Sequence, residues 1–253
     1  MGSDVRIAFL TTGDPLYLPA FFELVLDEFA AQTEGVFIAP PLYKGQSTRQ
    51  AAWRYYRTFG LGGAAGLGTR VLAAKARRRS ISGVCRNRGV ACSAVDDVNA
   101  QEFLERLRRA NVDVIVSVSC PQIFKKELID LPARGCLNVH GALLPQYRGV
   151  MPSFWMLANG ELQAGVSVYF VNEAIDAGDL CGQRSFEIEP DDTLERFLRR
   201  SKRIAAELLI DVLRRLEAGT LSRTPLDLGQ GSYYSWPDRE SVLRFRAAGR
   251  RLW

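Results

Sequence analysis

The chain has 253 residues and a mass of 28.2 kDa, a length that suits one medium domain with a full hydrophobic core. Its apolar content of 47%, charged content of 24% and mean hydropathy of -0.06 exclude disordered, collagen-like and multispanning membrane proteins. The net charge of +5 and the pI near 9.1 are compatible with an anionic partner but do not identify one.

Apolar runs alternate with helical patterns in the first half of the chain. Four runs are predicted strands: Val5–Leu10, Val36–Ala39, Val90–Val95 and Val112–Ser119. The stretches Tyr17–Gln32 and Ala100–Ala110 are predicted helices. Near-continuous apolar strands joined by helices are typical of a parallel sheet that is covered on both faces. We therefore expect an α/β fold with a mostly parallel sheet and helices on both faces.

The second half continues this pattern and then changes character. A short amphipathic helix is expected after Pro121, and three further strands are predicted: Cys136–His140, Ala164–Phe170 and Arg184–Ile188. Asp191, Asp192 and Thr193 are predicted to cap a long amphipathic helix that ends near Ala218. We place one domain at residues 1–218 and a short C-terminal extension, rich in aromatic residues and arginine, at residues 219–253.

The segment Lys44–Arg79 is too long for a simple connection between strands. Its glycine-rich run GLGGAAGLG is not expected to be a phosphate loop, because such a loop follows a buried strand and Trp53–Arg57 do not resemble one. The uncharged stretch Thr58–Thr69 is too short to span a bilayer. Two interpretations remain. One is a segment on an anionic membrane surface, and the other, which we favour, is a helical insert that packs on the domain or on a second subunit.

The cysteines and the histidine set the expected compartment and chemistry. The five cysteines are odd in number and form no CxxC pair: Cys85, Cys92, Cys120, Cys136 and Cys181. Without a signal-peptide pattern, these cysteines predict reduced thiols in a cytoplasmic protein. If the insert contacts a membrane, the protein is expected at the inner face of that membrane. The chain has 28 Arg and 5 Lys but only one His, so a mechanism that needs a neutral-pH proton carrier must use His140.

The segment Cys136–Leu180 carries the polar residues that we expect to form a site. Asn138 and His140 alternate on one strand, so their side chains point to the same face at the carboxyl end, where open parallel sheets bind ligands. Asp176 follows in a loop after the strand that ends at Phe170. An amide, the only imidazole and a carboxylate are therefore expected to converge at one edge of the sheet. No metal is expected, because one His with one Asp makes a poor zinc site.

At these residues the sequence resembles the folate-dependent formyltransferases. The shared pattern runs in order through five short elements: Asn138–His140, Ala142–Pro145, Tyr147–Gly149, Gly165–Ser167 and Asp176–Asp179. The resemblance covers the strand at Val112 through the helix that ends near Ala218. It implies a Rossmann-like fold and the transfer of a formyl group from N10-formyltetrahydrofolate to a primary amine.

Details within this family favour one acceptor. The run HGALLPQYRG with Pro152, Trp155 and Asn159–Glu161 looks most like enzymes that formylate amino sugars, so a nucleotide-linked or lipid-linked amino sugar is expected. The TTGDP sequence lacks the phosphate loop of the purine transformylases, and the roughly 35 residues after Ala218 cannot build the extra barrel of methionyl-tRNA formyltransferases. No recognised nucleic-acid module is present, so no nucleic acid is expected. Formylation of an amino acid, a peptide or a methionyl-tRNA-type amine, and non-catalytic folate or sugar binding, remain alternatives.

The resemblance also implies roles for individual residues. Asn138 and His140 are expected to donate hydrogen bonds to a developing oxyanion, and Asp176 is expected to orient His140 and relay a proton. The folate is expected to contact four residues: Gln122, Ile123, Val171 and Asn172.

Two further residues are expected at the acceptor. Arg148 suits either an anionic acceptor or the loop backbone, and Tyr169 stands where many sugar formyltransferases have histidine. In the tail, Tyr233, Tyr234 and Trp236 suit either an aromatic patch that closes the site or a homodimer contact.

Overall fold

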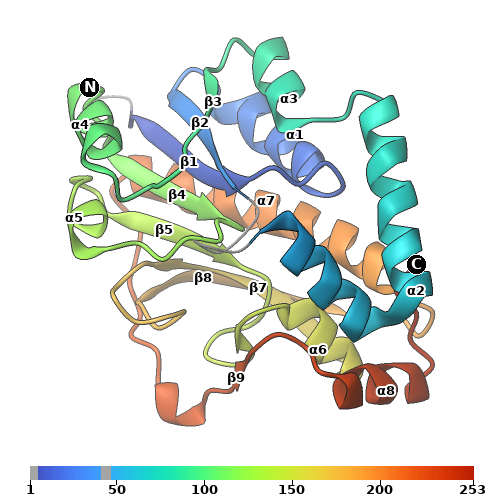
Figure 1. Cartoon of the computed structure of the whole chain (residues 1–253). Coiled ribbons are helices and arrows are strands. Elements are labelled where there is room, and N and C mark those ends of the chain that lie inside the picture. Colours follow the sequence, from blue (N-terminus) through green and yellow to red (C-terminus); the bar gives the residue numbers. More distant parts are fainter. Residues whose placement is uncertain (1–4, 41–46) are drawn as a thin grey trace.

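A seven-stranded sheet forms the centre of the computed structural model, which describes residues 5–40 and 47–253 (Figure 1). Its strands, in spatial order, are β3 (Cys92–Ala94), β2 (Thr33–Ala39), β1 (Ile7–Thr12), β4 (Val114–Val118), β5 (Cys136–His140), β7 (Gln163–Phe170) and β8 (Leu180–Glu187). The strands from β3 to β5 pair in parallel, whereas β7 and β8 are antiparallel. The prediction of a mostly parallel sheet is confirmed.

Helices cover both faces of this sheet, each over its own hydrophobic core. One face carries α1 (Leu18–Phe29), α3 (Ile81–Asn87) and α7 (Leu194–Glu217), and the other carries α4 (Gln101–Arg109) and α5 (Lys126–Ile129). Side chains alternate between the two cores along β1, because successive residues of a strand point to opposite faces. A strand buried on both sides needs a continuous apolar run, which explains why β1 shows no polar alternation.

The order of the strands reverses between β1 and β4. The chain leaves β1 toward β2 on one side and leaves β4 toward β5 on the other, so the connections diverge at the carboxyl ends. A crevice opens where such connections diverge, and open α/β sheets bind ligands there. The segments that follow β1, β4 and β5 therefore border one place at the edge of the sheet.

The predicted insert is a long helix, α2 (Thr48–Ala76), and residues 44–46 of the prediction lie outside the described residues. The glycine-rich run lies within this helix, which kinks at Gly60 (φ 76°, ψ -179°). The run is thus not a loop between a strand and a helix, as a phosphate cradle requires. None of the helices in the described ranges combines the length and apolar character that crossing a bilayer demands.

The C-terminal extension packs on α2 and on α6 (Pro152–Ala158). It contains a short 3₁₀ turn (Leu228–Gln230), a strand β9 (Tyr233–Tyr234) that pairs with β6 (Arg148–Gly149), and a helix α8 (Arg239–Ala247). Trp253 lies so close to Gly66 that a Cβ atom there would come within 2.3 Å of the indole nitrogen. The C-terminus accordingly lies beside α2 (Figure 1). The insert therefore packs on α6 and on the tail along one side and is exposed along the other.

Candidate active site

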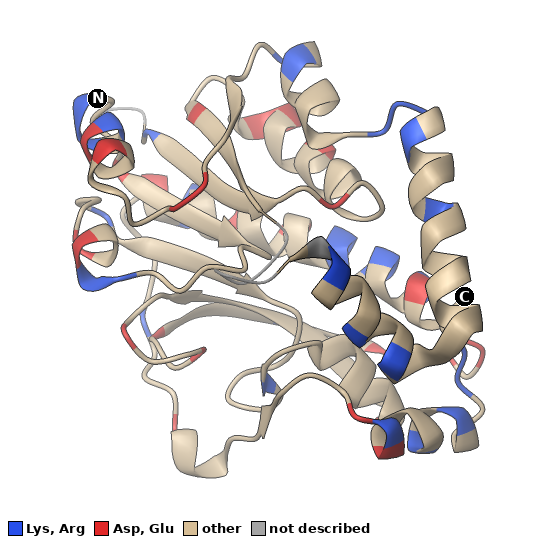
Figure 2. Cartoon of the chain, viewed as in Figure 1, with Lys and Arg blue, Asp and Glu red and all other residues tan. Residues whose placement is uncertain are grey.

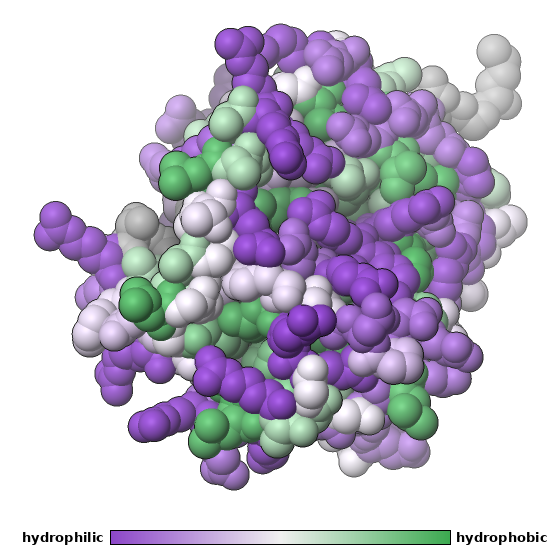
Figure 3. Space-filling model, turned by 90° about the vertical axis from the view of Figure 1, so that its right-hand side faces the viewer, coloured by the Kyte–Doolittle hydropathy of each residue, from purple (hydrophilic) through white to green (hydrophobic). Residues whose placement is uncertain are grey.

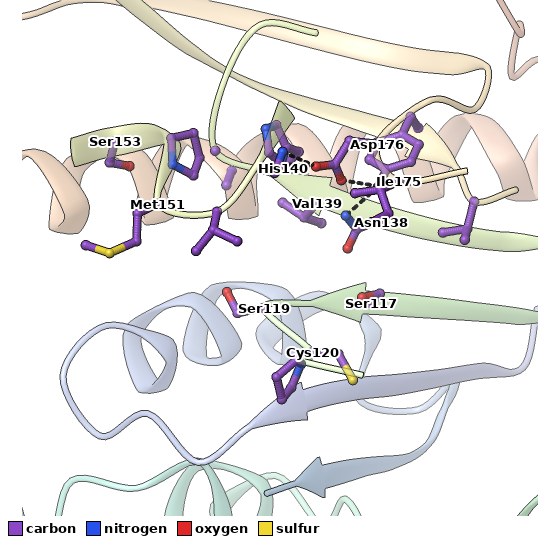
Figure 4. A pocket seen from close by; sticks show the side chains of 18 of the residues that line it. Ser117, Ser119, Cys120, Asn138, Val139, His140, Met151, Ser153, Ile175 and Asp176 are labelled. Carbon is purple, nitrogen blue, oxygen red and sulfur yellow. Dashed lines mark hydrogen bonds and ion pairs between the residues drawn. The ribbon is translucent and has the colours of Figure 1, made fainter. Parts of the chain in front are cut away.

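A cavity of about 730 Å³ lies in the crevice at the carboxyl ends of β1, β4 and β5. Asn138 and His140 line one wall together with Asp176, and Ser117, Ser119 and Cys120 lie across the cavity from them (Figure 4). The volume falls in the range of pockets that hold drug-sized ligands. The structure therefore brings the predicted amide, imidazole and carboxylate into one cavity.

A tyrosine hydroxyl connects the amide to the carboxylate. Asn138 and Tyr169 are directly paired across β5 and β7, so their side chains lie on the same face of the sheet. Asn138 Nδ2 donates to the Tyr169 hydroxyl at 2.9 Å, and that hydroxyl donates to Asp176 Oδ1 at 2.7 Å. Burial, with the negative charge of Asp176 beside it, raises the pKa of Tyr169 well above its ordinary value. The hydroxyl therefore keeps its proton and holds the two groups in place.

His140 is held between a carbonyl and a carboxylate. Its Nε2 lies 2.8 Å from the Tyr147 carbonyl oxygen, which can only accept, so Nε2 carries the proton. Its Nδ1 faces Asp176 Oδ2 at 3.7 Å, and that oxygen also accepts a hydrogen bond of 2.7 Å from the Gly149 amide. In the neutral imidazole, Nδ1 is thus the nitrogen that is available to take up a proton.

The loop that presents Asp176 depends on a glycine that follows it. A Cβ atom at Gly178 would come within 1.7 Å of the Phe170 carbonyl oxygen, so only glycine lets the loop fold back against the end of β7. Asp176 itself adopts a left-handed backbone conformation (φ 49°) and is buried. Backbone geometry therefore requires the glycine of the D-A-G-D turn, in addition to the carboxylate that Asp176 supplies to the site.

The four residues predicted to contact a folate all line the cavity. The polar side chains among them are already engaged. Gln122 accepts from the Val98 amide at 2.9 Å and donates to the Asp96 carbonyl at 2.7 Å, and Asn172 accepts from the Ala174 amide at 3.0 Å. A ligand in this part of the cavity would therefore contact mainly backbone groups and the apolar side chains of Ile123 and Val171.

The two predicted acceptor residues lie in different surroundings. Tyr169 lines the cavity, but its one proton is committed to Asp176. Arg148 is absent from the cavity wall, and its guanidinium lies 6.0 Å from the Tyr233 ring. Within the described residues its buried Nε has no hydrogen-bond partner. Tyr233, an aromatic residue of the tail, does line the cavity.

Sequence reasoning missed a second polar group of residues in the cavity wall. These residues are Asp14 and Tyr17 after β1, Ser119 after β4, and Lys202 on α7. Lys202 Nζ donates to Ser119 Oγ at 2.8 Å. Burial lowers the pKa of Lys202 and raises the pKa of Asp14. Asp14 could have been proposed from its position at the reversal of strand order, whereas Lys202 depends on how α7 packs, which no local pattern reveals.

The described residues contain no cluster of three or more His, Cys, Asp or Glu side chains that could hold a metal ion. Cys120 is the only cysteine in the cavity wall, and burial raises the pKa of its thiol to about 11. The thiol is therefore protonated at neutral pH and is a poor nucleophile.

Comparisons with known proteins identify the family of this chain. A family model described as formyl transferase matches residues 65–213. A methionyl-tRNA formyltransferase from Ruminiclostridium cellulolyticum is 37% identical over 136 residues, which make up 54% of this chain and 44% of that protein. One from Kosmotoga olearia is 32% identical over 160 residues, 63% of this chain and 51% of that protein. The chain thus spans about half the length of the curated relatives it matches.

Solved structures share the fold at low sequence identity. A sugar N-formyltransferase from Shewanella has a TM-score of 0.60 and 19% identity, covering 92% of this chain and 77% of that one. A glycinamide ribonucleotide transformylase from Symbiobacterium toebii has a TM-score of 0.63 and 18% identity, with 90% and 96% covered. An N-formyltransferase from Helicobacter canadensis, solved with folinic acid and dTDP-3-aminofucose, has a TM-score of 0.59 and 16% identity, with 91% and 71% covered.

Proposed function

Since this chain belongs to the formyl transferase family, we propose that it transfers a formyl group from N10-formyltetrahydrofolate to a primary amine. The observation that carries the proposal is the meeting of Asn138, His140 and Asp176 at one cavity wall (Figure 4). Acyl transfer to an amine requires donors for a developing oxyanion and a group that takes up a proton. An amide and an imidazole backed by a carboxylate supply these two functions.

The cavity suits a formylated folate. It is large enough for a drug-sized molecule, and its wall between Cys120–Phe124 and Val171–Asp176 offers backbone groups and apolar surface for a flat heterocycle. When bound, the folate supplies the formyl carbon and a nitrogen leaving group. We assign the contacts on this side to Gln122, Ile123, Val171 and Asn172, chiefly through their backbones.

The chemistry follows from the positions of the protons. Asn138 uses one amide hydrogen on Tyr169, which leaves the second to donate to the formyl oxygen. His140 carries its proton on Nε2, so Nδ1 takes up the proton that the attacking amine loses. Asp176, held by the Gly149 amide and the Tyr169 hydroxyl, stabilises the imidazolium that results. The same Nδ1 then gives its proton to the departing nitrogen.

For the acceptor we propose an amino sugar that occupies the opposite end of the cavity. Asp14 and Lys202 supply a carboxylate acceptor and an ammonium donor there, and Ser119 and Tyr17 add hydroxyl groups. Paired donors and acceptors of this kind match the adjacent hydroxyl groups of a sugar. The Asp14 loop offers no glycine-rich phosphate grip, so any phosphate of a carrier is expected to lie outside this end of the cavity.

A second acceptor is favoured by the sequence relatives. Two methionyl-tRNA formyltransferases are 37% and 32% identical over 136 and 160 residues, whereas the Shewanella sugar N-formyltransferase is 19% identical over 92% of this chain. The net charge of +5 would also suit a nucleic acid. Methionyl-tRNA is therefore the acceptor that the test must compare with amino sugars.

The test measures tetrahydrofolate release with nucleotide-linked amino sugars, amino acids and methionyl-tRNA offered in parallel. We expect turnover with the amino sugars, and His140→Ala should lower it by at least about 10²-fold. The affinity for 5-formyltetrahydrofolate, a non-transferring mimic, should change little in this variant. Unchanged turnover in His140→Ala would refute the catalytic assignment, and turnover with methionyl-tRNA alone would replace the acceptor. Folate binding without transfer to any amine would identify a binding protein.

We also propose that α2 rests on an anionic membrane surface at the cytoplasmic face, an arrangement that suits a lipid-linked acceptor. The described helix contains no Asp or Glu, and basic residues recur along it (Figure 2). Trp53 and Leu61 are 60% and 74% exposed, and on this side of the molecule hydrophobic residues lie among hydrophilic ones (Figure 3). Apolar side chains mixed with arginine favour an interfacial helix.

Co-sedimentation with phosphatidylserine vesicles at low salt tests this second proposal. We expect binding that Trp53→Ala combined with Arg57→Ala reduces severalfold, and no binding to neutral vesicles. Failure to bind the anionic vesicles would exclude the membrane contact and leave formyl transfer unaffected.

A further inference from the structure

The loop that holds His140 and Asp176 is itself held by the C-terminal extension. In the β6–β9 pair, the Arg148 amide donates to the Ser232 carbonyl at 2.9 Å, and the Val150 amide donates to the Tyr234 carbonyl at 2.8 Å. The Tyr147 amide donates to Ser232 Oγ at 2.8 Å. The extension therefore binds three backbone amides of this loop, two through Ser232 just before β9 and one through Tyr234 of β9.

Two backbone groups of the bound loop contact the proposed catalytic pair. The Tyr147 carbonyl accepts from His140 Nε2, and the Gly149 amide donates to Asp176. Ser232 thus fixes the amide of the same residue whose carbonyl fixes the imidazole. A shift of this loop would move the partner of Nε2 and the partner of Asp176 together.

The loop adopts a backbone conformation that needs outside support. Tyr147 has φ 56°, in the left-handed region that residues with a side chain rarely adopt. Gly149 has φ 95°, and a Cβ atom there would lie 2.2 Å from the Tyr234 carbonyl. Such conformations persist where the surrounding structure fixes them, and here the surrounding structure is β9.

Side chains strengthen the same junction. The Tyr147 and Tyr234 rings stack with centroids 5.1 Å apart, and Asn159 Nδ2 donates to both hydroxyls at 3.2 and 3.1 Å. Trp155 Nε1 donates to the Ser235 carbonyl at 3.0 Å. These contacts set how the tail lies on α6, and they are made through side chains of the loop and of α6. Ser232 is the tail side chain that hydrogen-bonds to the backbone of Tyr147, the residue whose carbonyl accepts from the imidazole.

We propose that Ser232 is a positioning residue, through which the tail fixes His140 in the tautomer with its proton on Nε2 and leaves Nδ1 for proton transfer. This inference rests on the proposed function for its catalytic consequence. It concerns a segment that lies outside the matched residues 65–213. It also gives the tail a role in positioning a residue of the same chain. This role differs from the aromatic patch and from the homodimer contact that the tail sequence suggested.

The test uses the fact that His140 is the only histidine of the chain. Protein labelled with ¹⁵N in the imidazole ring, and purified without a histidine tag, gives one pair of ring nitrogen signals that report the tautomer. We expect the wild type to show a protonated Nε2 at neutral to mildly alkaline pH. Ser232→Ala should shift both signals toward a mixture of tautomers and lower kcat by about tenfold or more, with the Kd for 5-formyltetrahydrofolate unchanged.

Three further variants make the result specific. Ser232→Thr keeps the hydroxyl and should restore the wild-type signals, and Ser232→Cys keeps the size with a weaker acceptor and should shift them if Ser232→Ala does not fold. Ser222→Ala, at an exposed tail position, should change neither readout. Wild-type ring signals in both Ser232→Ala and Ser232→Cys would overturn the inference. A wild-type protein without transferase activity would refute the proposed function instead, and the ring signals would still decide the role of Ser232.

Discussion

At the scale of single residues, the Tyr169 hydroxyl has the most consequential contacts, because it bonds to both Asn138 and Asp176. Tyr169→Phe keeps the ring and leaves the half-buried Asn138 donor and the buried Asp176 acceptor without this partner. We expect a loss of about 1–3 kcal/mol in the free energy of unfolding and a fall of about tenfold in kcat. Urea denaturation and steady-state kinetics measure the two effects.

The matched control is Tyr56→Phe, which removes a hydroxyl from a tyrosine on the exposed side of α2. It should leave stability and turnover unchanged. If Tyr169→Phe behaves like this control, the hydroxyl does not organise the site.

The carboxyl group of Asp14 should lower the free energy of unfolding at neutral pH. Burial raises its pKa above the ordinary 3.8, so the folded state binds the proton more tightly than the unfolded state does. Stability therefore falls as pH rises from about 3.8 through the raised folded value, and it stays lower above that value. We expect Asp14→Asn to raise the thermal unfolding temperature at pH 7 and to leave it unchanged near pH 4.

The same substitution, Asp14→Asn, should weaken the binding of the acceptor. Loss of a charged hydrogen-bonding group raises KM for the amino sugar by about tenfold or more. A variant that is more stable at pH 7 with an unchanged KM would remove Asp14 from the acceptor site, and a variant without a stability gain would contradict the pKa argument.

At the scale of elements, α2 depends on a single glycine for its kink. Gly60 combines φ 76° with ψ -179°, a region that is nearly exclusive to glycine, so Gly60→Ala should cost about 1–3 kcal/mol. Gly62, two residues later, is exposed, and a Cβ atom there would meet nothing within 4 Å. Gly62→Ala should therefore stabilise the helix by about 0.5–1 kcal/mol. Equal effects of the two substitutions on chemical denaturation would contradict this account of the kink.

The elements also show what periodicity can and cannot predict. Every predicted strand overlaps an observed one, and Thr193 caps α7 as predicted, accepting from the Arg196 amide. β8 begins at Leu180, four residues before the predicted strand, because its first residues alternate in burial without a strongly apolar run. The two-residue strands β6 and β9 carry no periodic signal, so their pairing could not be predicted.

The candidate site shows the same difference between features within one element, which the sequence predicts, and contacts between elements, which it does not. Alternation on β5 predicted that Asn138 and His140 share a face, because that depends on one strand alone. The contact between Asn138 and Tyr169 depends on the register of β5 against β7, and Lys202 depends on the packing of α7. Sequence patterns give positions within an element, whereas these contacts are set by how separate elements meet.

At the scale of the whole molecule, a third core joins the insert, α6 and the tail. Its members include Phe59, Phe154 and Phe245, from α2, α6 and α8. Phe59 is 1% exposed and lies 5.7 Å from Phe154 between ring centroids, while most of α2 is half-buried or exposed. The attachment of α2 to the body therefore depends strongly on this side chain.

Phe59→Ala should release this third core locally. Truncation of a buried phenylalanine costs about 3–5 kcal/mol, and here the loss should appear as faster amide hydrogen exchange in α2 and α8 with the central strands still protected. Phe103→Ala is the matched control, because Phe103 is buried in the core under α4 on the opposite side of the sheet. It should speed exchange in α4 and leave α2 and α8 as in the wild type. Uniformly faster exchange in both variants would mean that the insert and tail unfold only with the sheet.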